Sequence, residues 1–170
     1  FLDARDFQNL RTQTEGSYGG LGLSATTYAR IVTTISEVWM SLTGIFNSHL
    51  IMSAAVERFG TAEQKARFLP RFASAEMRGG LALTEPEYGW EPAQVQLQAT
   101  RQGDGFVLDG TKLFVPDANV ADQLLVAART GQGTSSGQGI SLFVVDKNAA
   151  GGSVRVQTGW IGPKVCEVTL

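Results

Sequence analysis

The sequence predicts an α+β protein in which helices come first along the chain and strands follow. Up to residue 78, apolar residues recur at steps of three and four, which is typical of buried helix faces. From Gly79 onward, short runs that alternate between apolar and polar residues are separated by Gly and Asp, which is typical of strands and tight turns. We therefore expect a helical segment over residues 1–78 and a β-domain over residues 79–170.

The composition indicates a chain with a buried core and argues against a nucleic-acid-binding surface. Of the 170 residues, 43% are hydrophobic and 18% are charged, so disorder is not expected. The formal net charge is -2, whereas a phosphate-binding surface needs clustered Lys and Arg. We also expect no membrane span and no signal peptide, because no apolar run approaches the roughly 18 residues that cross a bilayer.

The chain holds one cysteine, Cys166, and one histidine, His49. A single cysteine excludes an intrachain disulfide and a cysteine-rich zinc site, so we predict no metal site and a cytoplasmic location. A single histidine leaves His49 as the only candidate base for Ser-His-Asp hydrolysis. In its strand-like run, Cys166 is interpreted as inert packing.

Three helices are expected in the first part of the chain. The first follows the helix-breaking glycines of residues 16–22, with Ser24 as its N-cap. Its apolar residues fall on one face: Tyr28, Ile31, Val32, Ile35, Val38, Trp39 and Leu42. A second helix is expected over residues 45–59. Trp39, in the first helix, is interpreted as a core residue.

The third helix has a clear start signal and an internal breaker. Gly60 ends the second helix, and Thr61 with Gln64 forms a capping-box pattern. Pro70 is expected to break or restart this helix, because proline lacks the amide hydrogen that a helix interior needs.

The β-domain is expected to begin with a half-exposed strand, since Val95, Leu97 and Ala99 alternate with polar residues. Turns are predicted at residues 103–105 and 109–110. Further strands are predicted at residues 106–108, 113–115, 123–129, 140–146, 153–156 and 165–170. No GxGxxG and no P-loop is present, so a flavin site cannot be assigned from a dinucleotide fingerprint.

Four stretches in this order resemble acyl-CoA dehydrogenases, and together they cover nearly the whole chain. They are Tyr18-Gly19-Gly20-Leu21-Gly22, then residues 59–65 leading to Leu69-Pro70, then Leu83-Thr84-Glu85-Pro86, and finally residues 108–112 with Ala121-Asp122 and residues 126–129. The resemblance implies the end of an N-terminal helical domain followed by an antiparallel, β-barrel-like middle domain. A C-terminal helical domain would lie outside this chain.

The resemblance also implies a function, namely FAD-dependent α,β-dehydrogenation of an acyl-CoA thioester. In this family a carboxylate removes the α-proton and the β-hydride passes to the flavin. That carboxylate belongs to the C-terminal domain, so no catalytic residue is expected in this chain. We expect residues 1–170 alone to be inactive, and the whole protein to be a homo- or hetero-oligomer that passes electrons to an electron-transfer acceptor.

The resemblance places the cofactor-binding residues in three segments. The first is a strand and loop with Leu81, Leu83 and Thr84, whose hydroxyl would donate to the isoalloxazine edge. The others are Gly89 with Trp90, and Phe114, Val115 and Pro116. Trp90 would also contact the substrate, by stacking on it, or would simply cover the β-domain.

Two departures from the family pattern stand beside these assignments. Residues 87–92 replace the family's usual small residue, Gly, Ser and Asp, and Trp90 takes the place of the serine. Pro116 takes the place of a threonine and can donate no hydrogen bond to flavin N5. Glu85 precedes a proline at a loop entry, and we interpret it as a loop anchor without a catalytic role.

Alternatives remain open from the sequence. The chain could belong to a non-catalytic subunit that resembles these dehydrogenases, or be an inactive, truncated piece of one. An unrelated β-barrel ligand binder would require the four ordered motifs to be accidental. His49 is interpreted as a core histidine with a local hydrogen bond, and the alternative is a place lining the acyl side of the site.

Overall fold

The computed structural model describes residues 17–87, 91–133, 137–158 and 164–170. It divides the chain into two compact units, residues 1–78 and 79–170, which are described one at a time. The first unit is helical and the second is built from strands, which confirms the predicted α+β class. Within the described residues, no helix has both the length and the apolar character needed to cross a membrane.

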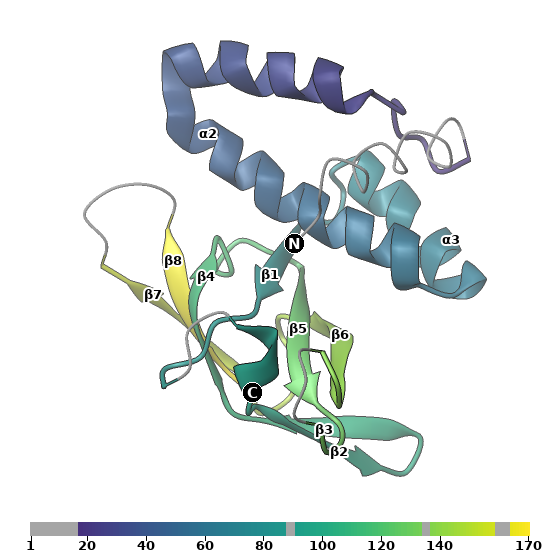
Figure 1. Cartoon of the computed structure of the whole chain (residues 1–170), viewed down its shortest axis with the longest axis vertical. Coiled ribbons are helices and arrows are strands. Elements are labelled where there is room, and N and C mark those ends of the chain that lie inside the picture. The colour runs from purple at the N-terminus through teal and green to yellow at the C-terminus, as the bar shows by residue number, and fades with distance from the viewer. Residues whose placement is uncertain (1–16, 88–90, 134–136, 159–163) are drawn as a thin grey trace. The chain divides into compact units, whose positions relative to one another are not determined.

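Helix α2 (Ala25–Phe59) begins as predicted, because the Ser24 hydroxyl accepts a hydrogen bond from the amide of Thr27 at 3.1 Å. It runs as two arms that meet at Trp39, where φ is -153° and ψ is 87° (Figure 1). The break therefore precedes the predicted one. The prediction of Trp39 as core was wrong, since its side chain is 60% exposed. Neither Gly nor Pro stands at this position, so the bend could not be predicted from the residue types.

Helix α3 (Ala62–Ala73) starts with the predicted capping box. The Thr61 amide donates to Gln64 Oε1 at 2.8 Å, and the Gln64 amide donates to Thr61 Oγ1 at 3.2 Å. The predicted break at Pro70 was wrong, because the helix continues through it. Its apolar face is buried through Phe68, Leu69 and Phe72, and this packing offsets the hydrogen bond that proline removes.

His49 packs against α3. Its Nε2 lies 3.0 Å from the carbonyl oxygen of Phe72, and the two rings meet edge to face with centroids 5.6 Å apart. The expected hydrogen bond of His49 is present, but its partner lies 23 residues along the chain and the side chain is half-buried, so the interpretation as a core histidine with a local bond holds only in part.

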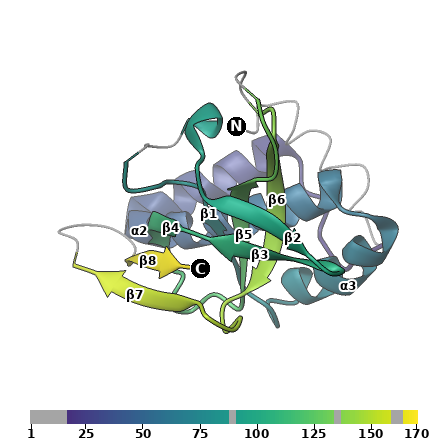
Figure 2. The same ribbon diagram turned by 90° about the horizontal axis from the view of Figure 1, so that it is seen from below.

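The β-unit contains two sheets (Figures 1 and 2). The first sheet consists of β1 (Gly79–Ala82), β2 (Gln98–Gln102), β3 (Gly105–Asp109), β5 (Gln123–Arg129) and β6 (Ile140–Asp146). The second consists of β4 (Thr111–Pro116), β7 (Ser153–Gln157) and β8 (Val165–Thr169), with a short 3-10 helix η1 (Pro92–Gln94) outside both sheets.

Strand β5 organises the first sheet. Strand β6 pairs with it in antiparallel orientation along its whole length, so β1 and β2 share its other edge and run parallel to it. The sheet is therefore mixed, whereas the sequence predicted antiparallel pairing, and the two sheets do not close into one barrel within the described residues.

The core of the β-unit lies between the two sheets. It includes side chains of β4, β5 and β8 with at most 1% exposure, among them Val115, Leu124, Val126, Cys166 and Val168. Cys166 is a packed thiol in this core, as interpreted from the sequence. The ends of β1 and β4, where the predicted site residues lie, therefore rest on a rigid base.

Candidate functional site

The structure brings together two predicted site segments that are far apart in the sequence. The amide of Leu113 donates to the carbonyl oxygen of Thr84 at 2.8 Å. The loop that follows β1 therefore lies beside β4, and the Thr84 loop adjoins the segment that carries Phe114 and Pro116.

The predicted residues of the first segment lie at the end of β1 and just after it. Leu81, Leu83 and Thr84 are each half-buried. Within the described part of the chain, the hydroxyl of Thr84 forms no hydrogen bond, so this donor is available to a ligand. Gly89 and Trp90, the predicted cofactor and substrate contacts of the next segment, lie outside the described residues.

The residues predicted in the third segment face in different directions. Phe114 is 58% exposed with a left-handed φ of 53°, at a place where the pairing of β4 with β8 shifts register. Val115 is 1% exposed and lies in the core, so the residue offers no exposed surface to a cofactor. Pro116 is half-buried at the end of β4.

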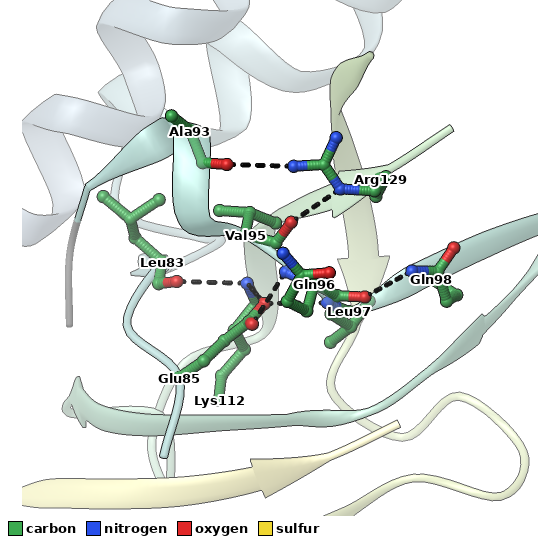
Figure 3. Close-up of polar contacts among 9 residues, drawn as sticks. All are labelled: Leu83, Glu85, Ala93, Val95, Gln96, Leu97, Gln98, Lys112 and Arg129. Carbon is green, nitrogen blue, oxygen red and sulfur yellow. Dashed lines mark hydrogen bonds and ion pairs between the residues drawn. The ribbon is translucent and has the colours of Figure 1, made fainter. Parts of the chain in front are cut away.

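A buried ion pair lies directly behind the Thr84 loop (Figure 3). Lys112 Nζ is 2.7 Å from Glu85 Oε1 and also donates to the carbonyl oxygen of Leu83 at 3.0 Å. The Lys112 side chain is 0% exposed and that of Glu85 is 6% exposed. Glu85 is thus a loop anchor, as interpreted from the sequence, and Lys112 is a partner that the sequence analysis missed.

The Glu85 carboxylate also fixes the far end of the same loop. Its Oε2 accepts from the amide of Gln96 at 2.8 Å and its Oε1 accepts from the amide of Leu97 at 2.9 Å (Figure 3). The predicted alternation is correct, since Val95 and Leu97 are buried and Gln96 is exposed. The strand nevertheless begins only at Gln98, because these amides bind a carboxylate instead of a neighbouring strand.

Arg129, the last residue of β5, also binds this loop. The sequence analysis did not identify it. Its Nε donates to the carbonyl oxygen of Val95 at 2.8 Å, and its Nη2 donates to that of Ala93 at 3.1 Å (Figure 3). Its amide donates to the carbonyl oxygen of Leu97 at 2.7 Å. The available signal for both missed residues was a long cationic side chain within an otherwise apolar strand, at Lys112 and at Arg129.

Burial and charge act in opposite directions on two ionisable groups of this region. Burial lowers the pKa of Lys112, and the hydrogen bond and charge of Glu85 oppose that shift. Burial raises the pKa of Asp117, which follows Pro116, and the charge of Lys164 opposes it. The ion pair thus holds the Lys112 ammonium in a place that would otherwise favour its neutral form.

A polar cavity of about 550 Å³ lies beside Arg129. Its walls include Gln96, Gln98, Arg129 and Thr130, together with residues 131–133. Such a lining suits a polar ligand rather than an acyl chain. No group of three or more metal-ligating side chains occurs in the described ranges.

The arrangement fits a planar aromatic cofactor such as a flavin. Phe114 offers an exposed aromatic ring, and Thr84 on the adjoining loop offers a free hydroxyl. Pro116 offers no hydrogen-bond donor, so Thr84 and main-chain amides are the donors that remain at this site. In the described part of the chain, nothing in this group could serve as a general base for a ligand, because Glu85 is already bound to Lys112 and two amides.

The chain is similar to known proteins along nearly its whole length. Residues 80–170 match the family described as "Acyl-CoA dehydrogenase, middle domain", and residues 6–76 match "Acyl-CoA dehydrogenase, N-terminal domain". The probable acyl-CoA dehydrogenase FadE10 of Mycobacterium tuberculosis is 37% identical over 149 residues, which cover 85% of this chain and 23% of FadE10. The chain thus spans less than a quarter of that relative's length.

Solved structures show the same fold. The crystal structure of glutaryl-CoA dehydrogenase from Mycobacterium smegmatis has a TM-score of 0.83 and 29% identity, covering 97% of this chain and 42% of that one. A structure of a glutaryl-CoA dehydrogenase from the same species in complex with FADH2 has a TM-score of 0.81 and 27% identity, covering 98% and 43%. Both parts of the sequence and the fold therefore lead to one conclusion: the chain belongs to the acyl-CoA dehydrogenase family.

Proposed function

We propose that the full-length protein catalyses the FAD-dependent α,β-dehydrogenation of an acyl-CoA thioester, and that this chain supplies flavin and substrate contacts. The observation that carries the proposal is the hydrogen bond from Leu113 to Thr84, which joins the two cofactor segments. It places a free hydroxyl on a loop beside the segment with the exposed ring of Phe114.

Each cofactor residue has a role in this proposal. The flavin, when bound, supplies the redox chemistry by accepting a hydride. The Thr84 hydroxyl donates to the edge of the ring, and Phe114 packs against it. Leu81, Leu83 and Pro116 contribute apolar surface or main chain, and Val115 supports this surface from the core. Gly89 and Trp90 would extend the contact toward the substrate. No residue of this chain is given the role of catalytic base.

Support for the substrate comes from the relatives and from the polar cavity. FadE10 is named as a probable acyl-CoA dehydrogenase, and the two solved structures reported above are glutaryl-CoA dehydrogenases. The cavity beside Arg129 is a suitable place for a polar portion of acyl-CoA, since its walls carry amide and hydroxyl groups. We further propose an electron-transfer acceptor as partner, an oligomeric full-length protein and a cytoplasmic location.

A second candidate is a non-catalytic subunit that binds no flavin. Pro116 favours it, because proline removes both the hydroxyl and the amide hydrogen that the family's threonine would provide. The departure at residues 87–92 favours it as well.

An absorbance spectrum of the purified full-length protein, with and without added FAD, separates the two candidates. The dehydrogenase should show flavin bands at about 370 and 450 nm, which are properties of the cofactor. Bleaching of the band at about 450 nm on addition of an acyl-CoA would then report substrate reduction of the flavin. A colourless protein that takes up no FAD would contradict the proposal and favour the subunit.

A further inference from the structure

We propose that Glu85 and Lys112 are positioning residues, whose ion pair sets the place of the Thr84 hydroxyl and the Phe114 ring against the flavin. The inference rests on the proposed function, because it concerns how that site is held. Three consecutive residues of the loop are bound by two consecutive residues of β4. Lys112 Nζ binds the carbonyl oxygen of Leu83 at 3.0 Å and Glu85 Oε1 at 2.7 Å, and Leu113 binds Thr84 at 2.8 Å.

The position of Lys112 in β4 connects both halves of the site. Two residues beyond it, Phe114 adopts a φ of 53° at the register shift that exposes its ring. A shift of the lysine side chain would move the Thr84 loop, and a shift of its main chain would move Phe114. One side chain therefore couples the donor on the loop to the ring on the strand.

The Glu85 carboxylate holds the other end of the loop. Besides Lys112, Glu85 binds the amides of Gln96 and Leu97, which lie at the far end of the loop. The ion pair therefore binds both ends of the segment from Leu83 to Leu97 (Figure 3). Loss of the ammonium would leave the carboxylate buried with amide partners only, and this end of the loop would lose its fixed spacing.

Stability alone does not account for this pair. Both side chains are removed from water, at 0% and 6% exposure. The free energy lost by removing two charges from water cancels much of the attraction between them. Two apolar side chains of similar volume would fill the same space, but they would not direct the carbonyl of Leu83 and the amides of Gln96 and Leu97 to fixed points. The directional bonds are what the ion pair adds.

The test uses the full-length protein with Lys112→Met, and with the double variant Glu85→Gln/Lys112→Met, which removes both charges if the single variant folds poorly. A core variant on β6, Phe143→Ala, serves as the control. Phe143 packs against the same core from the edge of β5 opposite β1. The measurements are the melting temperature, the dissociation constant for FAD, the absorption band of the bound flavin and its midpoint potential.

We expect the Lys112 variants to raise the FAD dissociation constant by about tenfold or more, and to shift the flavin band and its potential. Phe143→Ala should lower the melting temperature at least as much without those flavin changes. Equal losses of FAD affinity in Phe143→Ala and the Lys112 variants, or an unchanged flavin in the double variant, would overturn the inference and leave the proposed function intact. A wild-type protein that binds no FAD would overturn both.

Discussion

Pro116 ends β4 at the edge of the proposed flavin site and offers a ligand neither a hydroxyl nor an amide hydrogen. Its neighbours compensate only in part. Thr84 keeps a free hydroxyl on the adjoining loop, whereas Val115 turns its side chain into the core. The flavin would therefore be held without the hydroxyl and the amide hydrogen that the family pattern provides at this position.

Replacing Pro116 by threonine should return both the hydroxyl and the amide hydrogen. We expect Pro116→Thr to tighten FAD binding by about threefold to tenfold, which corresponds to roughly one net hydrogen bond. Titration of the full-length apoprotein with FAD, followed by flavin fluorescence, measures the effect.

Pro116→Val is the matched control, because valine restores the amide hydrogen and has the shape of threonine without its hydroxyl. A gain in Pro116→Thr that exceeds the gain in Pro116→Val belongs to the hydroxyl. If threonine and valine bind FAD no better than proline, the donor at this position plays no part in binding.

At the scale of single residues, the sequence predicted the role of Glu85 but not its binding partner. Glu85 was predicted as a loop anchor because it stands before a proline at a loop entry, and the anchor role holds. Its partner Lys112 belongs to one of the four ordered stretches, but the sequence does not indicate the pair, because Glu85 lies 27 residues away in the chain. Contacts between residues so far apart have no periodic signal, so only the folded chain reveals them.

Among the elements, the segment before β2 shows how a correct pattern can give a wrong boundary. Val95 and Leu97 alternate with exposed residues as a strand requires, yet the strand starts at Gln98. The alternation of apolar and polar residues predicts which side chains are buried. Strand pairing depends on where the amides bind, and here they bind Glu85.

Helix α3 gives the opposite case. Its capping box at Thr61 and Gln64 was predicted correctly, because all contacts of the box lie within four consecutive residues. Pro70 was expected to break the helix, but the packing of Phe68, Leu69 and Phe72 maintains it. Local rules therefore predicted the start of this element, and tertiary packing decided its continuation.

Gly110 connects β3 to β4 and allows Leu97 to pack closely against the turn. Its φ is 150°, and a Cβ there would lie 2.9 Å from Leu97 Cγ and 3.2 Å from Leu97 Cα. We expect Gly110→Ala to lower the free energy of unfolding by about 2–4 kcal/mol, because neither the main chain nor Leu97 can move away freely. Urea denaturation of the full-length protein measures this loss.

Gly103→Ala is the control for backbone conformation alone. Gly103 also has a positive φ, 58°, but a Cβ there would meet nothing within 4 Å. This variant should cost only about 1–2 kcal/mol. Equal costs for the two variants would mean that contact with Leu97 adds nothing at Gly110.

At the scale of the whole molecule, the isolated chain exposes many large apolar side chains. In the helical unit, Val38 is 89% exposed, Leu21 83%, and Met40 and Phe59 69% each. Val38 and Met40 flank the bend of α2 at Trp39. Large apolar side chains that are exposed on one part of a protein are often covered by another part.

The 170-residue chain should consequently self-associate when it is prepared alone, and it should show no acyl-CoA turnover with an artificial electron acceptor. Sedimentation velocity measures the association. Val38→Glu should reduce it, because a charge at this exposed position opposes apolar contact. Thr34→Glu adds the same charge to an exposed polar site of the same helix. A monomeric wild-type chain, or an equal effect of the two variants, would contradict this expectation.

The way Glu85 closes its loop has a consequence for change in the family. Its carboxylate holds the main-chain amides of residues 96 and 97, which every residue except proline provides. Only the two charged side chains must be kept, and the stretch between the anchors is free to diverge in composition. Residues 87–92, where this chain departs from the family pattern, fall within this stretch. The loop then acts as an exchangeable insert, in which evolution can vary ligand preference while the position of Thr84 is inherited unchanged.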